Sequence, residues 1–169
     1  MEINPELAQL VVDQHSAEIL NFLRYRNIAM EMDRRNYPRL AKFFEEQASE
    51  ELDHGKLWEK HLQARGVTFN IHPFPTVETF NELATLTDII EKFVIFEKET
   101  TADIQNIYDK ADELVDVPLK ALCTRMLEEQ MEEEETSTTL LEISKMYGPS
   151  GAGQCHFATT FHKMMPKDE

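Results

Sequence analysis

The sequence predicts an all-α fold, a four-helix bundle with one long crossover and a short fifth helix at the C-terminus. Four long segments repeat apolar residues at spacings of three, four and seven, which is the period of an amphipathic helix. No segment alternates polar and apolar residues as a strand does, and only five glycines and seven prolines occur in 169 residues. We expect a single domain over residues 1–169, because this length suits one hydrophobic core.

Caps and breakers set the expected helix boundaries. Asn4 followed by Pro5 is typical of a helix start, since proline fits the first helical position. Gly66 is typical of the residue just after a helix end. We expect the bundle over about residues 5–147 and a loop at 148–153. The expected helices are 5–35, 38–66, a third that begins between 79 and 87 and runs to 114, 118–147, and a short one at about 154–165.

The lengths of the connections predict the topology. Short turns join the first helix to the second and the third to the fourth, which predicts two antiparallel hairpins. The link from Val67 to about Thr85 is much longer than most helix–helix connections. A link of this length can run along the whole bundle, so we expect the second and third helices to lie parallel, as in bundles with one crossover.

Composition and charge exclude several classes of function. Lys and Arg total 17 against 32 Asp and Glu, a formal net charge of −15. This charge disfavours nucleic acid or an anionic membrane surface as a partner, and it favours attraction for cations. No apolar run reaches the ~18 residues of a membrane helix, and Met1–Asn4 lacks the basic start of a signal peptide. We therefore expect a cytoplasmic protein with two reduced thiols, Cys123 and Cys155.

Each apolar stripe is interrupted near its middle by an acidic residue. The stripe residues are Glu18, Glu51 with His54 one turn later, Glu97, Glu129 and Glu133. Ionised carboxylates inside a bundle cost several kcal/mol unless protons, basic partners or a metal neutralise them. Almost no basic residue shares these stripes at that height. Oxygen ligands with one imidazole suit iron or manganese, with zinc as a competitor.

Each of these residues taken alone also has an ordinary interpretation. A single glutamate in a stripe is more often an edge residue whose head reaches water, and one Glu-x-x-His spacing is expected by chance in so glutamate-rich a chain. Glu50 and Glu132 lie off the stripes and could be solvated. Tyr25 and Trp58 are expected to pack in the core, where both could border the site. Three histidines are expected at the surface or in loops: His15, His61 and His72. The coincidence across all four helices favours a metal centre.

Taken together, these segments resemble the prokaryotic non-haem ferritins over about residues 5–147. The matching segments are Glu18–Met30, Ala41–Phe44, Glu50–His54, Glu97 and Glu128–Glu133. Bacterioferritins, rubrerythrins and di-iron oxygenases carry a second Glu-x-x-His in the fourth helix. That motif is absent here, because no histidine occurs between His72 and His156.

The resemblance implies a di-iron ferroxidase centre inside one subunit. By position, Glu18, Glu51 and His54 match the ligands of the first iron. Glu51, Glu97 and Glu133 match those of the second, so that Glu51 bridges the two ions.

Further residues are implied around this centre. Gln130 matches a residue beside the second iron, and Tyr25 matches a tyrosine that is a candidate electron donor. The residues that match a third iron site are Glu50, Glu129, Glu132 and Glu133.

The resemblance also implies a function. Such subunits oxidise Fe(II) to Fe(III) with O₂ or H₂O₂, use no haem, and store ferric mineral inside a hollow homo-oligomer of 24 copies. Two alternatives stay open: a di-iron peroxidase or oxygenase that stores no iron, and a metal-free helical interaction protein.

The iron route into the cage is open at this stage. Lys120 and Cys123 stand where animal ferritins have acidic channel residues. A tail with Cys155, His156 and His162 could line a four-fold pore or could be a frayed surface segment.

Overall fold

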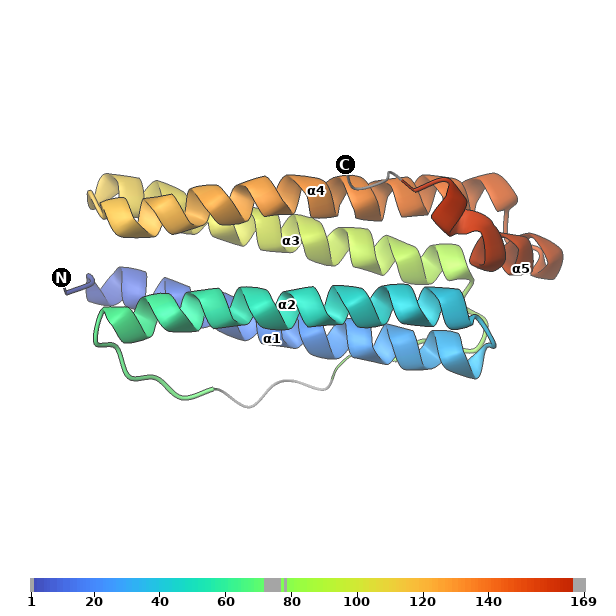
Figure 1. Ribbon diagram of the computed structural model, residues 1–169, viewed down its shortest axis with the longest axis horizontal. Helices are drawn as coiled ribbons and strands as arrows, with labels where there is room; N and C mark the ends of the chain where they lie inside the picture. The colour runs from blue at the N-terminus through green and yellow to red at the C-terminus, as the bar shows by residue number, and fades with distance from the viewer. Residues whose placement is uncertain (1, 72–76, 78, 166–169) are drawn as a thin grey trace.

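Four long helices form the bundle in the computed structural model, which describes residues 2–71, 77 and 79–165. The described elements are α1 (Pro5–Arg34), α2 (Pro38–Ala64), α3 (Leu86–Glu113), α4 (Val117–Tyr147), α5 (Gly151–Thr160) and a 3-10 turn (Phe161–Lys163). The pairs α1–α2 and α3–α4 are antiparallel hairpins, and α3 begins at the end of the bundle opposite to the end of α2 (Figure 1). Helices α2 and α3 therefore run parallel, as the long link predicts.

Local sequence signals explain where the long helices begin. Asn4 Oδ1 accepts a hydrogen bond from the Glu6 backbone N–H at 2.8 Å, with Pro5 at the first helical position. Thr85 and Asp88 form a reciprocal capping box at the start of α3. Asp116 caps α4 through the Leu119 backbone N–H at 3.2 Å. The four long helices consequently begin and end within a few residues of the expected boundaries.

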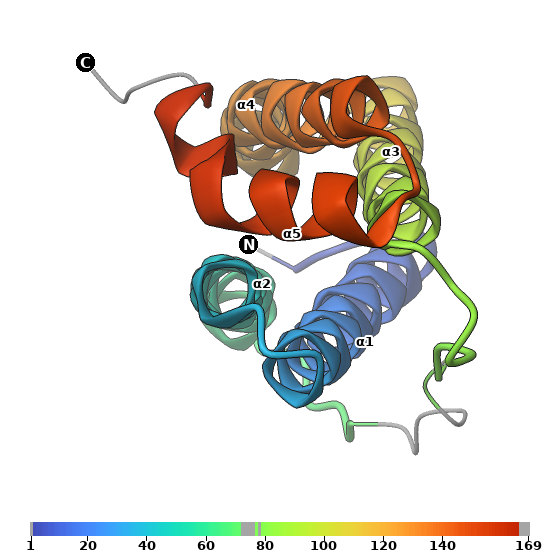
Figure 2. The same ribbon diagram turned by 90° about the vertical axis from the view of Figure 1, so that its right-hand side faces the viewer.

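The fifth helix begins three residues earlier than the sequence predicts, so the expected loop ends at Ser150. Ser150 Oγ accepts a hydrogen bond from the Gly153 backbone N–H at 3.1 Å, which starts the helix at Gly151. Gly153 permits this start, because a Cβ atom there would lie 2.1 Å from the Tyr147 carbonyl oxygen. Helix α5 lies across the end of the bundle and contacts both α4 and α2 (Figure 2).

The core consists of two apolar clusters with a polar layer between them. One cluster lies near α5 and includes Tyr25, Phe44 and Phe93, and the other lies at the opposite end and includes Trp58 and Leu62. The buried polar side chains between the clusters are Gln14, Glu18, Asn21, Glu51, His54, Glu97, Thr100 and Gln130. Among the described residues, no helix combines the length and the apolar character that a bilayer crossing requires.

Candidate metal centre

The polar layer brings together acidic residues from all four long helices. Two sets of possible ligand atoms each lie within 4.8 Å of one another: Glu18, Glu51 and His54 in one, and Glu51, Glu97 and Glu133 in the other. Glu51 belongs to both sets, so two cations could share it. These are the same two sets that the sequence resemblance implies.

Several atoms in this layer that could bind a metal ion have no hydrogen-bond partner among the described residues. Four of the buried unpaired atoms belong to the two ligand sets: Glu18 Oε2, Glu51 Oε2, His54 Nδ1 and Glu133 Oε2. The others are Gln14 Oε1, His15 Nδ1 and Gln130 Oε1. Buried polar atoms in folded proteins are nearly always paired, so unpaired ones require an explanation. The four atoms of the ligand sets, three of them on carboxylates, suit bound cations. The residues present therefore fit a pair of metal ions.

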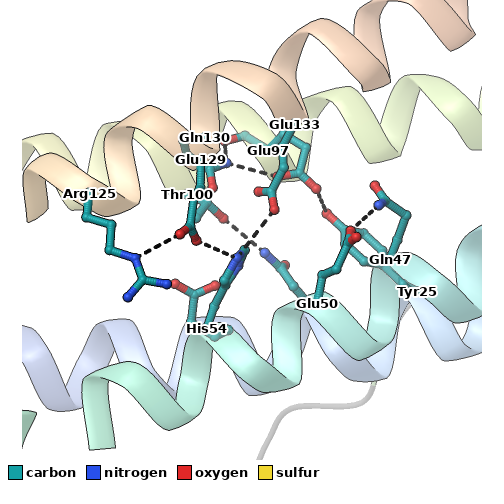
Figure 3. A network of polar contacts seen from close by, with 12 residues as sticks. Tyr25, Gln47, Glu50, His54, Glu97, Thr100, Arg125, Glu129, Gln130 and Glu133 are labelled. Carbon is teal, nitrogen blue, oxygen red and sulfur yellow. Dashed lines mark hydrogen bonds and ion pairs between the residues drawn. The ribbon is translucent and has the colours of Figure 1, made fainter. Parts of the chain in front are cut away.

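The carboxylate of Glu97 is held on both oxygens. Tyr25 donates its hydroxyl hydrogen to Oε1, and Gln130 Nε2 donates to Oε2 at 2.9 Å and to the Glu97 carbonyl oxygen at 3.2 Å (Figure 3). Tyr25 and Gln130 are both fully buried. They therefore fix the orientation of Glu97, which is what outer partners do for the ligands of a metal site.

Without a cation, protons neutralise this layer. Burial raises the pKa of Glu133 to about 10, and the negative charges of Glu97 and Glu18 add to the effect. Burial also raises the pKa of Glu51 well above its ordinary range and raises the pKa of Glu97. Burial, with the nearby charge of Glu97, raises the pKa of the Tyr25 phenol as well, so this residue stays a hydroxyl donor. Cations that bind here must displace protons.

A cavity of about 840 Å³ opens between α2 and α4 beside the centre. His54 and Glu133 line it, together with Glu50, Glu129 and Glu132. Among the described residues, the last three do not form a third compact ligand set of the kind described above. The residues expected at a third iron site therefore line one cavity, but they do not meet the 4.8 Å spacing of the two sets above.

Glu129 does not lie in the buried stripe where the sequence analysis placed it. Its side chain is 35% exposed, and it bridges His54 Nε2 at 3.2 Å and Arg125 Nε at 3.0 Å. Gln130, the next residue, is fully buried instead. Neighbouring helix positions differ by about 100° around the axis, so the inward face of α4 is centred nearer to Gln130 than to Glu129.

Some expectations for individual residues are wrong. His15 is only 2% exposed, because the ring of Phe69, from the segment after α2, packs on it with ring centroids 5.0 Å apart. Two other residues concern the iron route, which the sequence leaves open. Cys123 is fully buried in the apolar cluster, where burial raises its pKa to about 12, and Lys120 pairs with Asp112. His72 lies outside the described residues.

Other expectations for individual residues agree with the structure. Both cysteines are free thiols, Cys155 being exposed. Trp58 and Tyr25 are fully buried, and both border the centre.

Gln14 was not singled out from the sequence, although its position one turn before Glu18 on the same helix is a usable signal. Its amide hydrogen-bonds Glu18 at 2.9 Å.

Comparison with known proteins agrees with this geometry. The Ferritin family, described as a ferritin-like domain, matches residues 8–146, a stretch that contains every residue of both ligand sets. The chain belongs to the ferritin family. This match, together with the bacterial relatives described next, confirms the prediction of a prokaryotic non-haem ferritin with a four-helix bundle and a short C-terminal helix.

Two relatives of this ferritin come from bacteria. It is 28% identical over 148 residues to the bacterial non-heme ferritin of Staphylococcus epidermidis, covering 86% of this chain and 87% of the relative. It is 30% identical over 139 residues to ferritin BfrB of Mycolicibacterium smegmatis, covering 82% of this chain and 76% of the relative.

Solved structures show the same fold at lower identity. An open pore ferritin from the archaeon Archaeoglobus fulgidus superposes with a TM-score of 0.87 at 18% identity, over 93% of this chain and 94% of that one. A closed form of that ferritin, engineered by mutagenesis, gives a TM-score of 0.86 at 18% identity, over 94% of this chain and 95% of that one.

Proposed function

We propose that this ferritin oxidises Fe(II) to Fe(III) at its two-metal centre and stores the ferric product as mineral inside a cage of its own copies. The observation that carries the proposal is the pair of ligand sets sharing Glu51, with buried donor atoms that no described protein group satisfies. Family membership supports iron as the metal. Fe(II) is the substrate in this scheme, and no haem takes part.

Each of the two ligand sets binds one Fe(II) ion. Glu18, Glu51 and His54 hold one ion, and Glu51, Glu97 and Glu133 hold the other. Each Fe(II) loses one electron, so two ions reduce one O₂ to H₂O₂ with uptake of two protons, or one H₂O₂ to water. The carboxylates favour the more highly charged Fe(III) product, and this preference is the electrostatic contribution of the protein.

The cavity beside the centre suits the removal of the product. Glu50, Glu129 and Glu132 lie along its wall, and His54 and Glu133 connect it to the ligand sets. We propose that these three carboxylates hold a third iron ion on its way from the centre to the store. The net charge of −15 per chain concentrates Fe(II) around the assembly.

Assembly and location belong to the same proposal. The cage is a homo-oligomer of 24 copies in the cytoplasm, and the two free thiols suit that reducing compartment. Sedimentation that finds only dimers at micromolar concentration contradicts the cage.

Tyr25, which donates a hydrogen bond to Glu97, is the candidate electron donor if the oxidant takes up more than the two electrons that the iron ions supply.

The decisive experiment adds two equivalents of Fe(II) per chain without oxygen, then admits air and follows the absorbance of Fe(III). The double substitution Glu51→Ala with His54→Ala should slow oxidation to the rate without protein. Asp53→Ala is the matched control, because Asp53 lies between these residues but is exposed and paired with Lys56 at 2.8 Å. Oxidation at the wild-type rate in the double variant overturns the assignment of the centre.

The same preparation separates the two alternative functions. Oxidation without retention of many irons per chain favours a redox enzyme that stores nothing. A melting temperature that does not change with Fe(II), Zn(II) or Mn(II) favours a metal-free interaction protein, since a ligand that binds only the folded state must stabilise it.

A further inference from the structure

The carboxylate of Glu18 is held on one side only. Trp58 Nε1 and Gln14 Nε2 both donate to the same oxygen, Oε1, each at 2.9 Å. The other oxygen, Oε2, is buried without a hydrogen-bond partner among the described residues. Glu18 and Trp58 are fully buried and Gln14 is 2% exposed, so water does not compete freely for these bonds.

The sequence places both donors on the faces that carry the ligands. Gln14 precedes Glu18 by four residues on α1, and Trp58 follows His54 by four residues on α2. Residues four apart on a helix lie on the same face, one turn from each other. One turn of each helix therefore supplies a ligand, and the adjacent turn supplies a donor to Glu18.

Gly55 lets the two helices approach closely at this height. A Cβ atom at position 55 would lie 3.0 Å from Ile19 Cδ1 and 3.7 Å from Glu18 Cβ. The lack of a side chain on α2 thus brings the start of the Glu18 side chain close to α2. Trp58, one turn along from the ligand His54, reaches the Glu18 carboxylate across this contact.

The second ion position is built differently. Glu97 accepts one hydrogen bond on each oxygen, from Tyr25 and from Gln130, so its surroundings do not select one oxygen. Glu18 receives both of its bonds on one oxygen, Oε1, and Oε2 is left without a hydrogen-bond partner among the described residues. Glu18 and Glu97 are therefore oriented in unequal ways.

We infer that Trp58 and Gln14 are positioning residues that make Glu18 a one-oxygen ligand and pre-organise the first ion position. This inference rests on the proposed function of the centre as a two-metal site. Without the two donors, the Glu18 carboxylate can rotate to bind with both oxygens or turn away from the ion. Loss of such outer partners weakens metal binding by about 10–100-fold in other metal sites.

The test measures metal binding rather than turnover. Zn(II) is titrated by calorimetry into the assembled, metal-free wild type and into Trp58→Phe, Gln14→Leu and the double variant. We expect the affinity for the first ion to fall by about tenfold or more in each single variant, and less than additively in the double one, with a smaller effect on the second ion. The visible spectrum of bound Co(II) should change in the variants, because the coordination by Glu18 changes.

Leu62→Ala is the matched packing control. Leu62 is fully buried one turn beyond Trp58 in the same apolar cluster and donates no hydrogen bond from its side chain. Its truncation should lower the melting temperature and leave the Zn(II) affinity and the Co(II) spectrum as in the wild type.

Two outcomes overturn the inference and can be told apart. If the wild type binds two ions and Trp58→Phe binds them with the same affinity and the same Co(II) spectrum, Trp58 only fills space and this inference alone fails. If the wild type binds neither ion, the proposed function fails and the inference falls with it.

Discussion

Replacing Glu133 by glutamine should stabilise the metal-free protein, although it removes a predicted ligand. Burial and the charges of neighbouring carboxylates raise the pKa of Glu133 to about 10 from an ordinary value of 4.5. Below pH 4.5 the residue carries a proton in both the folded and the unfolded chain. Between pH 4.5 and about pH 10, only the folded chain keeps the proton, so a rise in pH deprotonates and stabilises the unfolded chain. The free energy of unfolding is therefore highest at low pH and falls as the pH rises toward 10.

The size of the effect follows from this difference. Each pH unit between the two pKa values shifts the free energy of unfolding by about 1.36 kcal/mol, so the loss at pH 7 is about 3 kcal/mol. Glutamine has nearly the same shape and does not titrate. Because the remaining carboxyls rearrange around the amide, we expect a gain of about 2 kcal/mol at pH 7, or roughly 4–8 °C in melting temperature for a chain of this length.

The assay compares thermal unfolding of the chelator-treated proteins at one protein concentration, at pH 5 and at pH 8. The difference between Glu133→Gln and wild type should increase with pH, and saturating Zn(II) should reverse it, because only the wild type has the complete second ligand set. Glu132→Gln is the control, since this neighbouring carboxylate is exposed. A Glu133→Gln variant that is less stable than wild type at pH 8, or a difference that does not change with pH, refutes the reasoning.

Three further predictions concern separate parts of the molecule. Arg65→Met should lower the free energy of unfolding in urea by about 3–5 kcal/mol, because Arg65 pairs with Asp116 at 2.7 Å and both side chains are at most 8% exposed. A smaller loss than that caused by breaking the exposed pair of Lys56 and Asp53 contradicts this prediction. Gly153→Ala should detach α5, seen as faster hydrogen exchange confined to the tail, because the new Cβ atom meets the Tyr147 carbonyl oxygen at 2.1 Å; unchanged exchange would show that α5 adapts. Fluorescence from Trp58, the only tryptophan, should change on anaerobic metal addition and saturate at two ions per chain; emission that ignores the metal would place the ions elsewhere.

The helices and the height of the centre follow from local sequence features. Asn4, Thr85 and Asp116 start their helices through caps that involve only residues two or three positions away. Acidic residues near the middle of every stripe predict a buried polar layer, because a stripe at helical period must face the core. Glu18, Glu51 and Glu97 accordingly lie buried at one level.

Details that depend on contacts between helices could not be predicted in this way. The period defines a face about 100° wide, but the rotation of α4 within that face, which buries Gln130 and exposes part of Glu129, depends on packing against α3. His15 is buried because a segment more than fifty residues later covers it.

The sequence by itself determined the helical fold, the direction of each helix and the identity of the acidic residues that meet, since spacing along one helix and the length of one link are enough for these. Only the tertiary structure decided which atoms of those residues are free to bind an ion. That choice is made across the interface between α1 and α2, where the Trp58 indole occupies one oxygen of Glu18 and leaves the other unpaired. Hydrogen bonds between distant segments depend on the distance and rotation of whole helices, and no local pattern encodes these.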